Sequence, residues 1–260
     1  MALNVLAIIP ARGGSKAVKL KNIHLFNGKP LMAYTIGDAK RSRLISRVVV
    51  STDNQEIASV AESLGAEVPF LRPPEIATCT TPDLPVVRHC AEFLKQQGWN
   101  ADIIVWLRPT QIFRTANDID LMIEKCIQNE HFHSVRAICK ASYPPHWMKV
   151  IRGEYLEAFL PSEPVYTRRQ DLPEVYQGNG TIEVFRYSTV LTTDSMYGHK
   201  VGYYMMDDWS HIDVDTYDDL LRAEVLYQKW IEIGGNNGPM TGAGTARVQE
   251  FNMNERDRSV

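Results

Sequence analysis

Residues 8–22 read IIPARGGSKAVKLKN, an apolar strand pattern that runs directly into a loop rich in glycine and basic residues. Gly13 and Gly14 allow the backbone to turn its N–H groups toward one point, and nearby cations add the positive charge that amides lack. The cations of this loop are Arg12, Lys16, Lys19 and Lys21. Such a loop after an N-terminal strand predicts a polyphosphate site in an α/β fold, with a solvated basic turn as the alternative.

Strand and helix patterns alternate over the first half of the chain. The predicted strands are 3–9, 47–52 and 102–107, and the predicted helices are 30–41, 55–64, 85–97 and 116–128. Residues 102–107 are almost continuously apolar, which is typical of a strand buried on both faces. The alternation predicts an α/β fold, a doubly wound and mostly parallel sheet that binds ligands at the carboxyl ends of its strands.

The alternation breaks between residues 142 and 186, where several prolines interrupt short β-like pieces at 148–151 and 155–160. We expect this stretch to form a small β-rich insertion that leaves the sheet. Strands at 201–206 and 211–214 and a helix at 217–233 then complete a main domain of residues 1–234. The remaining residues, 235–260, are rich in small, polar and charged residues, which predicts a disordered tail.

The composition favours a globular protein of the cytoplasm. A chain of 260 residues that is 44% hydrophobic can form one large domain. The net charge of −3 argues against nucleic acid or a membrane surface as a partner. We find neither a signal-peptide pattern nor the roughly 20 apolar residues of a membrane span. The four cysteines form no C-x-x-C pair, so we expect small buried thiols in a reducing compartment.

The basic loop contains neither G-x-x-x-x-G-K-[ST] nor G-x-G-x-x-G, so neither a P-loop ATPase nor a dinucleotide-dependent dehydrogenase is indicated. Instead, IPARGGSK at 9–16 followed by LKN at 20–22 resembles the N-terminal motif of the CMP-N-acylneuraminate synthetases, the cytidylyltransferases that activate sialic acids. The resemblance extends over residues 5–233. It implies a Rossmann-like nucleotidyltransferase fold whose insertion makes a homodimer. It also implies nucleotide binding by Arg12, Gly13, Gly14, Ser15, Lys16 and Asn22, with Arg12 and Lys21 as catalytic cations.

Two further motifs follow predicted strands. In RPPE at 72–75, the resemblance assigns Arg72 to the cytosine, although an arginine fixed by a turn would read the same. LRPTQIFR at 107–114 resembles the family's L-x-P-T-S-P-L-R, at a strand end that borders the sugar. Arg108 and Thr110 are therefore predicted sugar contacts. Because relatives commonly carry glutamine at position 108, Arg108 suggests a different acyl pattern or a differently placed carboxylate contact.

RRQDLP at 168–173 and YQGNG at 176–180 resemble two more elements of the family. The resemblance implies that Arg169 binds the sugar carboxylate, that Gln170 lies near the sugar, and that Lys149 reaches the ligands from the dimer arm. A double arginine between prolines could equally be a solvated turn. A carboxylate nevertheless needs a cation, and a bidentate arginine fits that group best.

The sequence DVDT at 213–216 carries two carboxylates two residues apart. On an extended chain both would project from one face, and like charges so close are costly unless a cation lies between them. Asp213 and Asp215 are therefore predicted Mg²⁺ ligands and catalytic residues, which agrees with the family's D-x-D-T. A helix cap is the competing interpretation for Asp215 and Thr216.

Together these motifs predict an enzyme that couples CTP to a nonulosonic acid for cell-surface glycan synthesis, such as lipopolysaccharide or capsule. The anomeric hydroxyl would attack the α-phosphate and displace pyrophosphate, with catalysis by positioning and charge stabilisation. Three alternatives stay open. The sugar could be legionaminic or pseudaminic acid, the enzyme could be a guanylyltransferase for sugar 1-phosphates, or the chain could be a non-catalytic nucleotide-sugar sensor.

Overall fold

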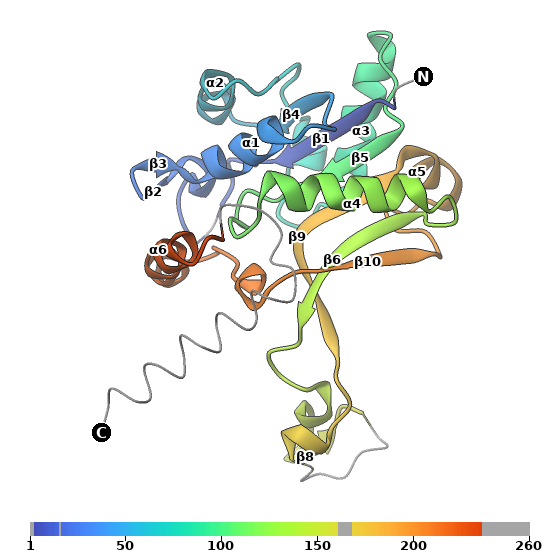
Figure 1. Cartoon of the computed structure of the whole chain (residues 1–260). Coiled ribbons are helices and arrows are strands. Elements are labelled where there is room, and N and C mark those ends of the chain that lie inside the picture. Colours follow the sequence, from blue (N-terminus) through green and yellow to red (C-terminus); the bar gives the residue numbers. More distant parts are fainter. Residues whose placement is uncertain (1–2, 16, 161–167, 236–260) are drawn as a thin grey trace.

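A computed structural model describes residues 3–15, 17–160 and 168–235. In this part of the chain a six-stranded sheet has the order β10-β6-β9-β5-β1-β4 (Figure 1). β1 pairs in parallel with β4 and β5, and β10 pairs in parallel with β6, whereas β9 is antiparallel to β5 and β6. The prediction of a mostly parallel sheet is confirmed. The strands are β1 (Val5–Pro10), β4 (Arg47–Ser51), β5 (Ile103–Trp106), β6 (Ser134–Lys140), β9 (Tyr176–Arg186) and β10 (Val201–Met205).

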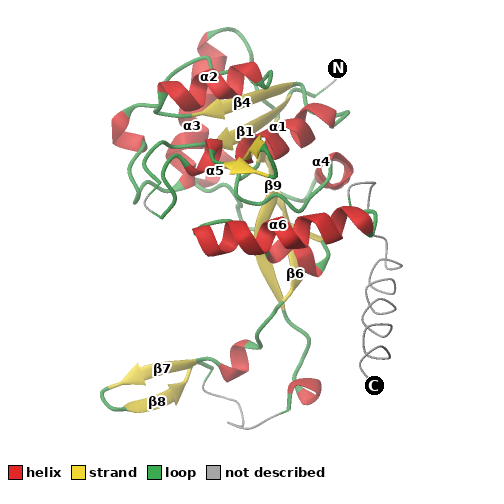
Figure 2. Ribbon diagram, turned by 90° about the vertical axis from the view of Figure 1, so that its left-hand side faces the viewer, coloured by secondary structure: helices red, strands yellow, loops and turns green. Residues whose placement is uncertain are grey.

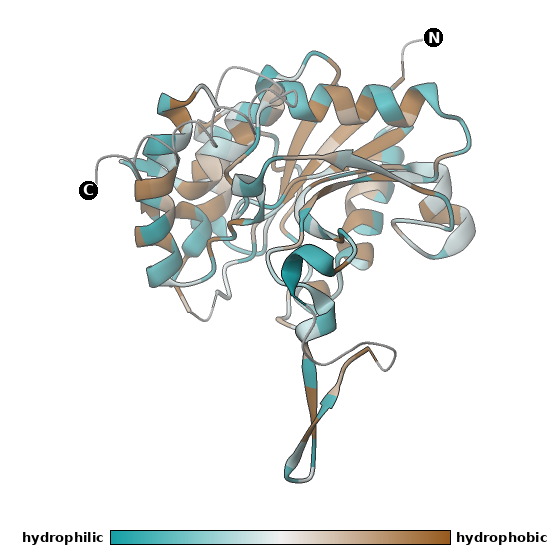
Figure 3. Cartoon of the chain, turned by 60° about the horizontal axis from the view of Figure 1, so that its bottom comes forward, coloured by the Kyte–Doolittle hydropathy of each residue, from teal (hydrophilic) through white to brown (hydrophobic). Residues whose placement is uncertain are grey.

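Helices cover both faces of this sheet, as a doubly wound fold requires. α1 (Leu31–Arg41), α2 (Gln55–Ser63) and α4 (Ala116–Gln128) pack on one face, and α3 (Asp83–Gln96) and α5 (Tyr187–Thr193) pack on the other. The side chains of β1 alternate between these two layers, because successive residues of a strand point to opposite faces. Hydrophobic colour accordingly dominates the central strands and marks stripes along the helices (Figure 3).

α6 (Tyr217–Glu232) builds a third apolar cluster. Its Tyr227 and Trp230 pack with Phe26 and Phe113, which come from the small hairpin of β2 (Leu25–Phe26) and β3 (Lys29–Pro30) and from the loop after β5. Val214 is fully buried in the same cluster. α6 therefore fixes the segment 213–216 beside the loop that follows β5.

A narrow arm leaves the body between β6 and β9 (Figure 2). It carries the antiparallel hairpin of β7 (Lys149–Arg152) and β8 (Tyr155–Ala158), as the sequence predicts, together with short 3-10 turns. The excursion ends earlier than predicted, because residues 176–186 form β9 inside the main sheet. The 3-10 turns of the arm are η3 (Pro145–Trp147) and η4 (Arg169–Asp171). The other 3-10 turns, η1 (Lys21–Ile23), η2 (Pro74–Ile76) and η5 (Asp208–His211), lie in the body.

One predicted element is wrong, and others were not predicted. Residues 211–214 are not a strand: η5 ends at His211, and no regular element follows until α6 begins. β6, β9 and α5 have no counterpart among the predicted elements. The predicted tail falls almost wholly on residues 236–260, which lie outside the described part of the chain. Within the described ranges, no helix is long and apolar enough to cross a membrane.

Candidate active site

A cavity of about 410 Å³ opens at the carboxyl ends of β1 and β5. This is where a doubly wound sheet binds its ligands. Four segments line it: the loop after β1, residues 72–86, the end of β5 with the residues after it, and residues 215–216. Eight predicted site residues lie in this one cavity, namely Arg12, Ser15, Lys21, Asn22, Arg72, Arg108, Thr110 and Asp215.

The loop after β1 is held by its own backbone and by its neighbours. The Gly13 amide donates to Asp53 Oδ1 at 2.8 Å, and the Ser15 amide donates to the Gly13 carbonyl at 2.9 Å. The Gly14 amide has no acceptor among the described residues, so it is the amide of the three that is available to a ligand. The buried Asn22 side chain donates to the Arg12 carbonyl at 3.1 Å, and this hydrogen bond fixes the start of the loop. Lys16 lies outside the described residues.

Arg72 is buried against the end of β4. Its Nε donates to Ser51 Oγ at 3.0 Å and its Nη2 donates to the Ser51 carbonyl. Burial lowers the pKa of Arg72, while the nearby Asp53 carboxylate opposes that effect. The guanidinium is thus a rigid donor in the cavity wall, a geometry that suits a flat polar group such as a nucleobase.

Lys21 and Asp215 form an ion pair in the cavity, with Lys21 Nζ 2.5 Å from Asp215 Oδ1. The side chain of Asp215 is 67% exposed, whereas that of Lys21 is 12% exposed. Thr216 caps α6 through a reciprocal capping box with Asp219, so the helix-cap interpretation applies to Thr216. Asp215 itself stays in the cavity.

Asp213 is two residues before Asp215 in the chain but is placed differently. Its Oδ1 atom is buried and has no hydrogen-bond partner among the described residues. The next residue, Val214, donates its amide to the Thr110 carbonyl at 3.1 Å, which ties the segment to the loop after β5. A buried carboxylate oxygen without a partner is costly, and a hard cation would satisfy it. The free Asp213 oxygen fits a Mg²⁺ ligand, but Asp213 is not among the residues that line the cavity with Asp215, and no group of three or more Asp, Glu, His or Cys is found in the described ranges.

Arg108 lines the cavity, but protein acceptors already surround its guanidinium. It contacts the carboxylates of Asp83 and Glu183 and the carbonyl of Gly180. Burial lowers the pKa of Arg108, but the two carboxylates outweigh this and raise it overall. Arg108 is thus a permanent cation whose charge is largely compensated.

The remaining predicted sugar contacts lie on the arm. Lys149 begins β7, and Arg169 and Gln170 line a second cavity of about 450 Å³ at the base of the arm. The two cavities share no lining residue. A single chain therefore does not bring these three residues to the residues around Lys21.

One wall of the cavity, residues 78–83 at the start of α3, was not among the site residues predicted from the motifs. Thr78, Cys79, Thr81 and Asp83 line the first cavity, and Cys79 is exposed whereas the other three cysteines are buried free thiols. The signal was available in TCTTPD at 78–83, a cluster of hydroxyl side chains immediately before a helix. Side chains before a helix N-terminus often face a ligand, because the helix leaves backbone N–H groups unpaired there.

Comparisons with known proteins agree with this geometry. A family model described as "Cytidylyltransferase" matches residues 6–229. A CMP-N,N'-diacetyllegionaminic acid synthase of Legionella pneumophila is 32% identical over 87% of this chain and 97% of that protein. A pseudaminic acid cytidylyltransferase of Campylobacter jejuni is 32% identical over 86% of this chain and 96% of that protein.

One solved structure supports the fold itself. A CMP:2-keto-3-deoxy-manno-octonic acid synthetase complexed with CTP superimposes with a TM-score of 0.66 at 15% identity. The match covers 87% of this chain and 99% of that chain. At this identity the likeness concerns the fold alone.

Proposed function

This chain belongs to the cytidylyltransferase family, and we propose that it transfers the cytidylyl group of CTP to a nonulosonic acid, releasing pyrophosphate. The observation that carries the proposal is the first cavity, which combines a glycine-rich basic loop, a rigid arginine and the carboxylate of Asp215 at the carboxyl end of the sheet. Relatives named for legionaminate and pseudaminate activation support the sugar class.

In this proposal the loop after β1 binds the triphosphate. Arg12 and Lys21 neutralise the α-phosphate and the leaving pyrophosphate, and the free Gly14 amide adds a backbone donor. The other proposed nucleotide-binding residues of this loop are Gly13, Ser15, Lys16 and Asn22. Arg72 faces the cytosine. The sugar hydroxyl forms the new P–O bond, the bond from the α-phosphate to the bridging oxygen breaks, and the hydroxyl proton leaves to solvent or a nearby base.

Asp213 and Asp215 would hold Mg²⁺. When bound there, the ion supplies charge neutralisation of the phosphate oxygens and lowers the pKa of the attacking hydroxyl. Asp215 must exchange its Lys21 partner to become a ligand, and Lys21 is then free to contact the triphosphate.

The sugar contacts on the arm lead to a homodimer proposal. Arg169, Gln170 and Lys149 share no cavity with the nucleotide residues of their own chain, so in this proposal they serve the site of a partner subunit. The arm exposes several large apolar side chains, which is typical of a surface that another chain covers. Those side chains are Tyr143, Met148, Ile151, Tyr155, Leu156 and Phe159.

Thr110 is the proposed sugar contact on the body; it lines the cavity with Asp215, and its carbonyl accepts the Val214 amide. We also propose a cytoplasmic location, since the described free thiols fit a reducing compartment, and a role in supplying a surface glycan such as lipopolysaccharide or capsule.

Pyrophosphate release tests the function. The purified protein receives Mg²⁺ and either CTP or GTP, with N-acetylneuraminate, N,N'-diacetyllegionaminate, a pseudaminate or a sugar 1-phosphate. We expect release with CTP and one nonulosonate. Release only with GTP and a sugar 1-phosphate would identify a guanylyltransferase, and CTP binding without release would identify a sensor.

Replacing Asp213 with asparagine tests the metal role. The D213N variant keeps the size of the side chain but removes the charge that would bind Mg²⁺, so we expect turnover to fall about a hundredfold or more. Circular dichroism should be unchanged. D218N is the matched control, because Asp218 lies in the first turn of α6 outside the cavity. Near-wild-type turnover in D213N would contradict the proposal that Asp213 binds Mg²⁺.

A further inference from the structure

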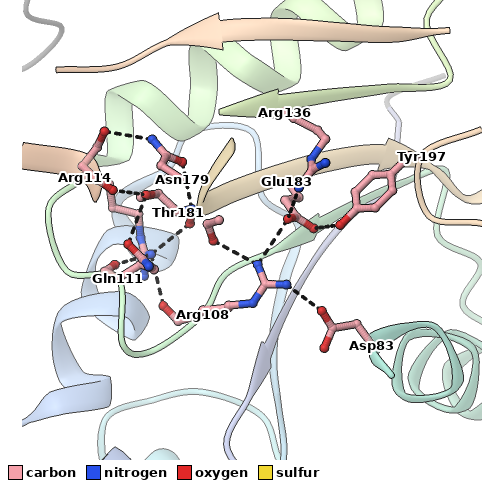
Figure 4. A network of polar contacts seen from close by, with 11 residues as sticks. Asp83, Arg108, Gln111, Arg114, Arg136, Asn179, Thr181, Glu183 and Tyr197 are labelled. Carbon is pink, nitrogen blue, oxygen red and sulfur yellow. Dashed lines mark hydrogen bonds and ion pairs between the residues drawn. The ribbon is translucent and has the colours of Figure 1, made fainter. Parts of the chain in front are cut away.

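The Arg108 guanidinium is held from three sides (Figure 4). Nη1 donates to the Gly180 carbonyl at 3.1 Å and to Glu183 Oε1 at 3.2 Å, and Nη2 lies 2.6 Å from Asp83 Oδ2. Gly180 has a φ of +70°, and a Cβ there would lie 3.2 Å from Nη1. The glycine therefore lets the guanidinium lie directly against β9.

Glu183 explains why a cation is needed at this place. Its side chain is 2% exposed, and a buried carboxylate is stable only when it is paired. Besides Arg108, it accepts hydrogen bonds from Arg136 Nη2 at 3.4 Å and from the Tyr197 hydroxyl at 2.9 Å. Burial and the Glu183 carboxylate raise the pKa of Tyr197 to about 12, so the phenol remains a donor.

The charges in this network balance. Two guanidiniums, Arg108 and Arg136, face two carboxylates, Asp83 and Glu183. A substrate carboxylate approaching Arg108 would meet Asp83 and Glu183 as well, so the network offers it no surplus positive charge. The geometry is therefore poorly suited to the carboxylate-binding role that the sequence suggests.

On its exposed side the network contacts the cavity wall of residues 78–83 through Asp83. Asp83 is the first residue of α3, where the helix dipole favours a carboxylate. Thr78, Cys79 and Thr81 line the cavity immediately before it, and the Thr78 and Thr81 hydroxyls are 2.8 Å apart. The pair of Asp83 and Arg108 thus joins this wall, residues 78–83, to the end of β5.

Resting on the proposed function, we infer that Arg108 is a positioning residue for the nucleotide and not a ligand of the sugar acid. Through Asp83 it holds the wall of residues 78–83, which lines the same cavity as Arg72. That wall offers hydroxyl groups to the polar edge of a pyrimidine, and Val86 offers an apolar surface to its ring. Arg108 thus affects CTP binding only by holding residues 78–83 in place, and its positive charge compensates the buried Glu183 carboxylate.

The D83N variant tests this inference with the least disturbance. The Asp83 side chain is 38% exposed, and asparagine keeps its size while the bond from Arg108 to Glu183 remains. We expect the Kd for CTP, measured by calorimetry without sugar, to rise about fivefold, the upper range for a partly exposed ion pair. The KM for the sugar acid should stay within about twofold. E56Q, which removes an acid from the first turn of α2, should change neither constant.

R108K completes the test. Lysine keeps a cation near Glu183 but cannot form the fork that reaches Asp83, Glu183 and Gly180 together. We expect R108K alone to weaken CTP binding, and to add no further loss when combined with D83N. Amide hydrogen exchange without ligand should become faster at residues 78–83 in D83N.

Two results would overturn the inference while leaving the proposed function intact. One is CTP binding and amide exchange unchanged in D83N. The other is a rise of more than about tenfold in the sugar-acid KM of R108K without a matching rise in D83N, which would make Arg108 a sugar ligand. A wild-type protein that binds no CTP would instead overturn the proposed function, and the nucleotide role of Arg108 with it.

Discussion

Gly13 and Gly14 are neighbours in the basic loop, but a side chain would meet different surroundings at each. A Cβ on Gly13 would lie 2.9 Å from the Cβ of Asn54, which caps α2, whereas a Cβ on Gly14 would meet no heavy atom within 4 Å. The Gly13 amide is bound by Asp53, and the Gly14 amide is free among the described residues. Gly13 therefore serves the fold, and Gly14 is the candidate for close approach of a phosphate.

This difference predicts opposite phenotypes for two alanine variants. G13A should lower the free energy of unfolding by about 1–3 kcal/mol, because the loop or Asn54 must shift. G14A should leave stability within about 0.5 kcal/mol and raise the KM for CTP, because its methyl group stands where a phosphate would approach. Urea unfolding and steady-state kinetics on both variants check this. A G14A variant with unchanged CTP kinetics would contradict the proposal that a phosphate of CTP closely approaches Gly14.

At the level of the elements, Asp207 caps η5 from a half-buried position. Its Oδ1 accepts hydrogen bonds from the Trp209 and Ser210 amides at 3.1 and 3.2 Å. Burial raises the pKa of Asp207 from 3.8 to about 6, and these amides only partly oppose the rise. The folded state thus keeps this proton at pH values where the unfolded chain has lost it.

The sign of the effect on stability follows from that difference. The contribution of Asp207 is fully present below pH 3.8 and is lost as pH rises through about 6, a change of roughly 2–3 kcal/mol. D207N can still cap η5 but cannot ionise, so its stability relative to wild type should increase between pH 4 and pH 7. Denaturant unfolding at both pH values measures this, with D208N, an exposed neighbour, as the control. A constant difference between wild type and D207N would contradict the prediction.

The elements also show where sequence patterns stop being informative. The helix at 116–128 has the predicted bounds, because its apolar period is regular and Thr115 forms a capping box with Asp118. The prolines between residues 142 and 186 predict an irregular insertion, yet residues 176–186 form β9, with Gly178 and Gly180 inside it. Both glycines admit arginine side chains, Arg136 and Arg108. Such close approach depends on partners distant in sequence and leaves no local pattern.

The same reasoning applies to the candidate site. Residues of the basic loop and Asp215 could be grouped from motifs, because each follows a strand or precedes a helix of the sheet's ligand-binding edge. The network around Glu183 could not, because it joins β5, β6, β9 and α3 through side chains whose pairing is set by the strand order. The 211–214 strand was wrong because four residues with alternating hydrophobicity also fit a 3-10 turn and a loop.

At the scale of the whole molecule, the projecting arm predicts a dimer. Ile151 and Leu156 are cross-strand partners on the hairpin, with exposures of 77% and 72%. I151D should convert a dimer to a monomer in light scattering at micromolar concentration and reduce turnover, since Arg169 would no longer reach a partner's site. L221D, which places the same charge at an exposed apolar position of α6, is the matched control. A wild-type monomer with full activity would contradict the dimer.

The destination of the α-phosphate distinguishes cytidylyl transfer from simple CTP binding. CTP labelled at its α-phosphate is incubated with the protein, Mg²⁺ and each nonulosonate in turn, and the products are separated. We expect the label to move into a CMP-sugar while unlabelled pyrophosphate is released. Label that stays in CTP with every nonulosonate, although CTP binds, would contradict the assignment of this cavity to cytidylyl transfer.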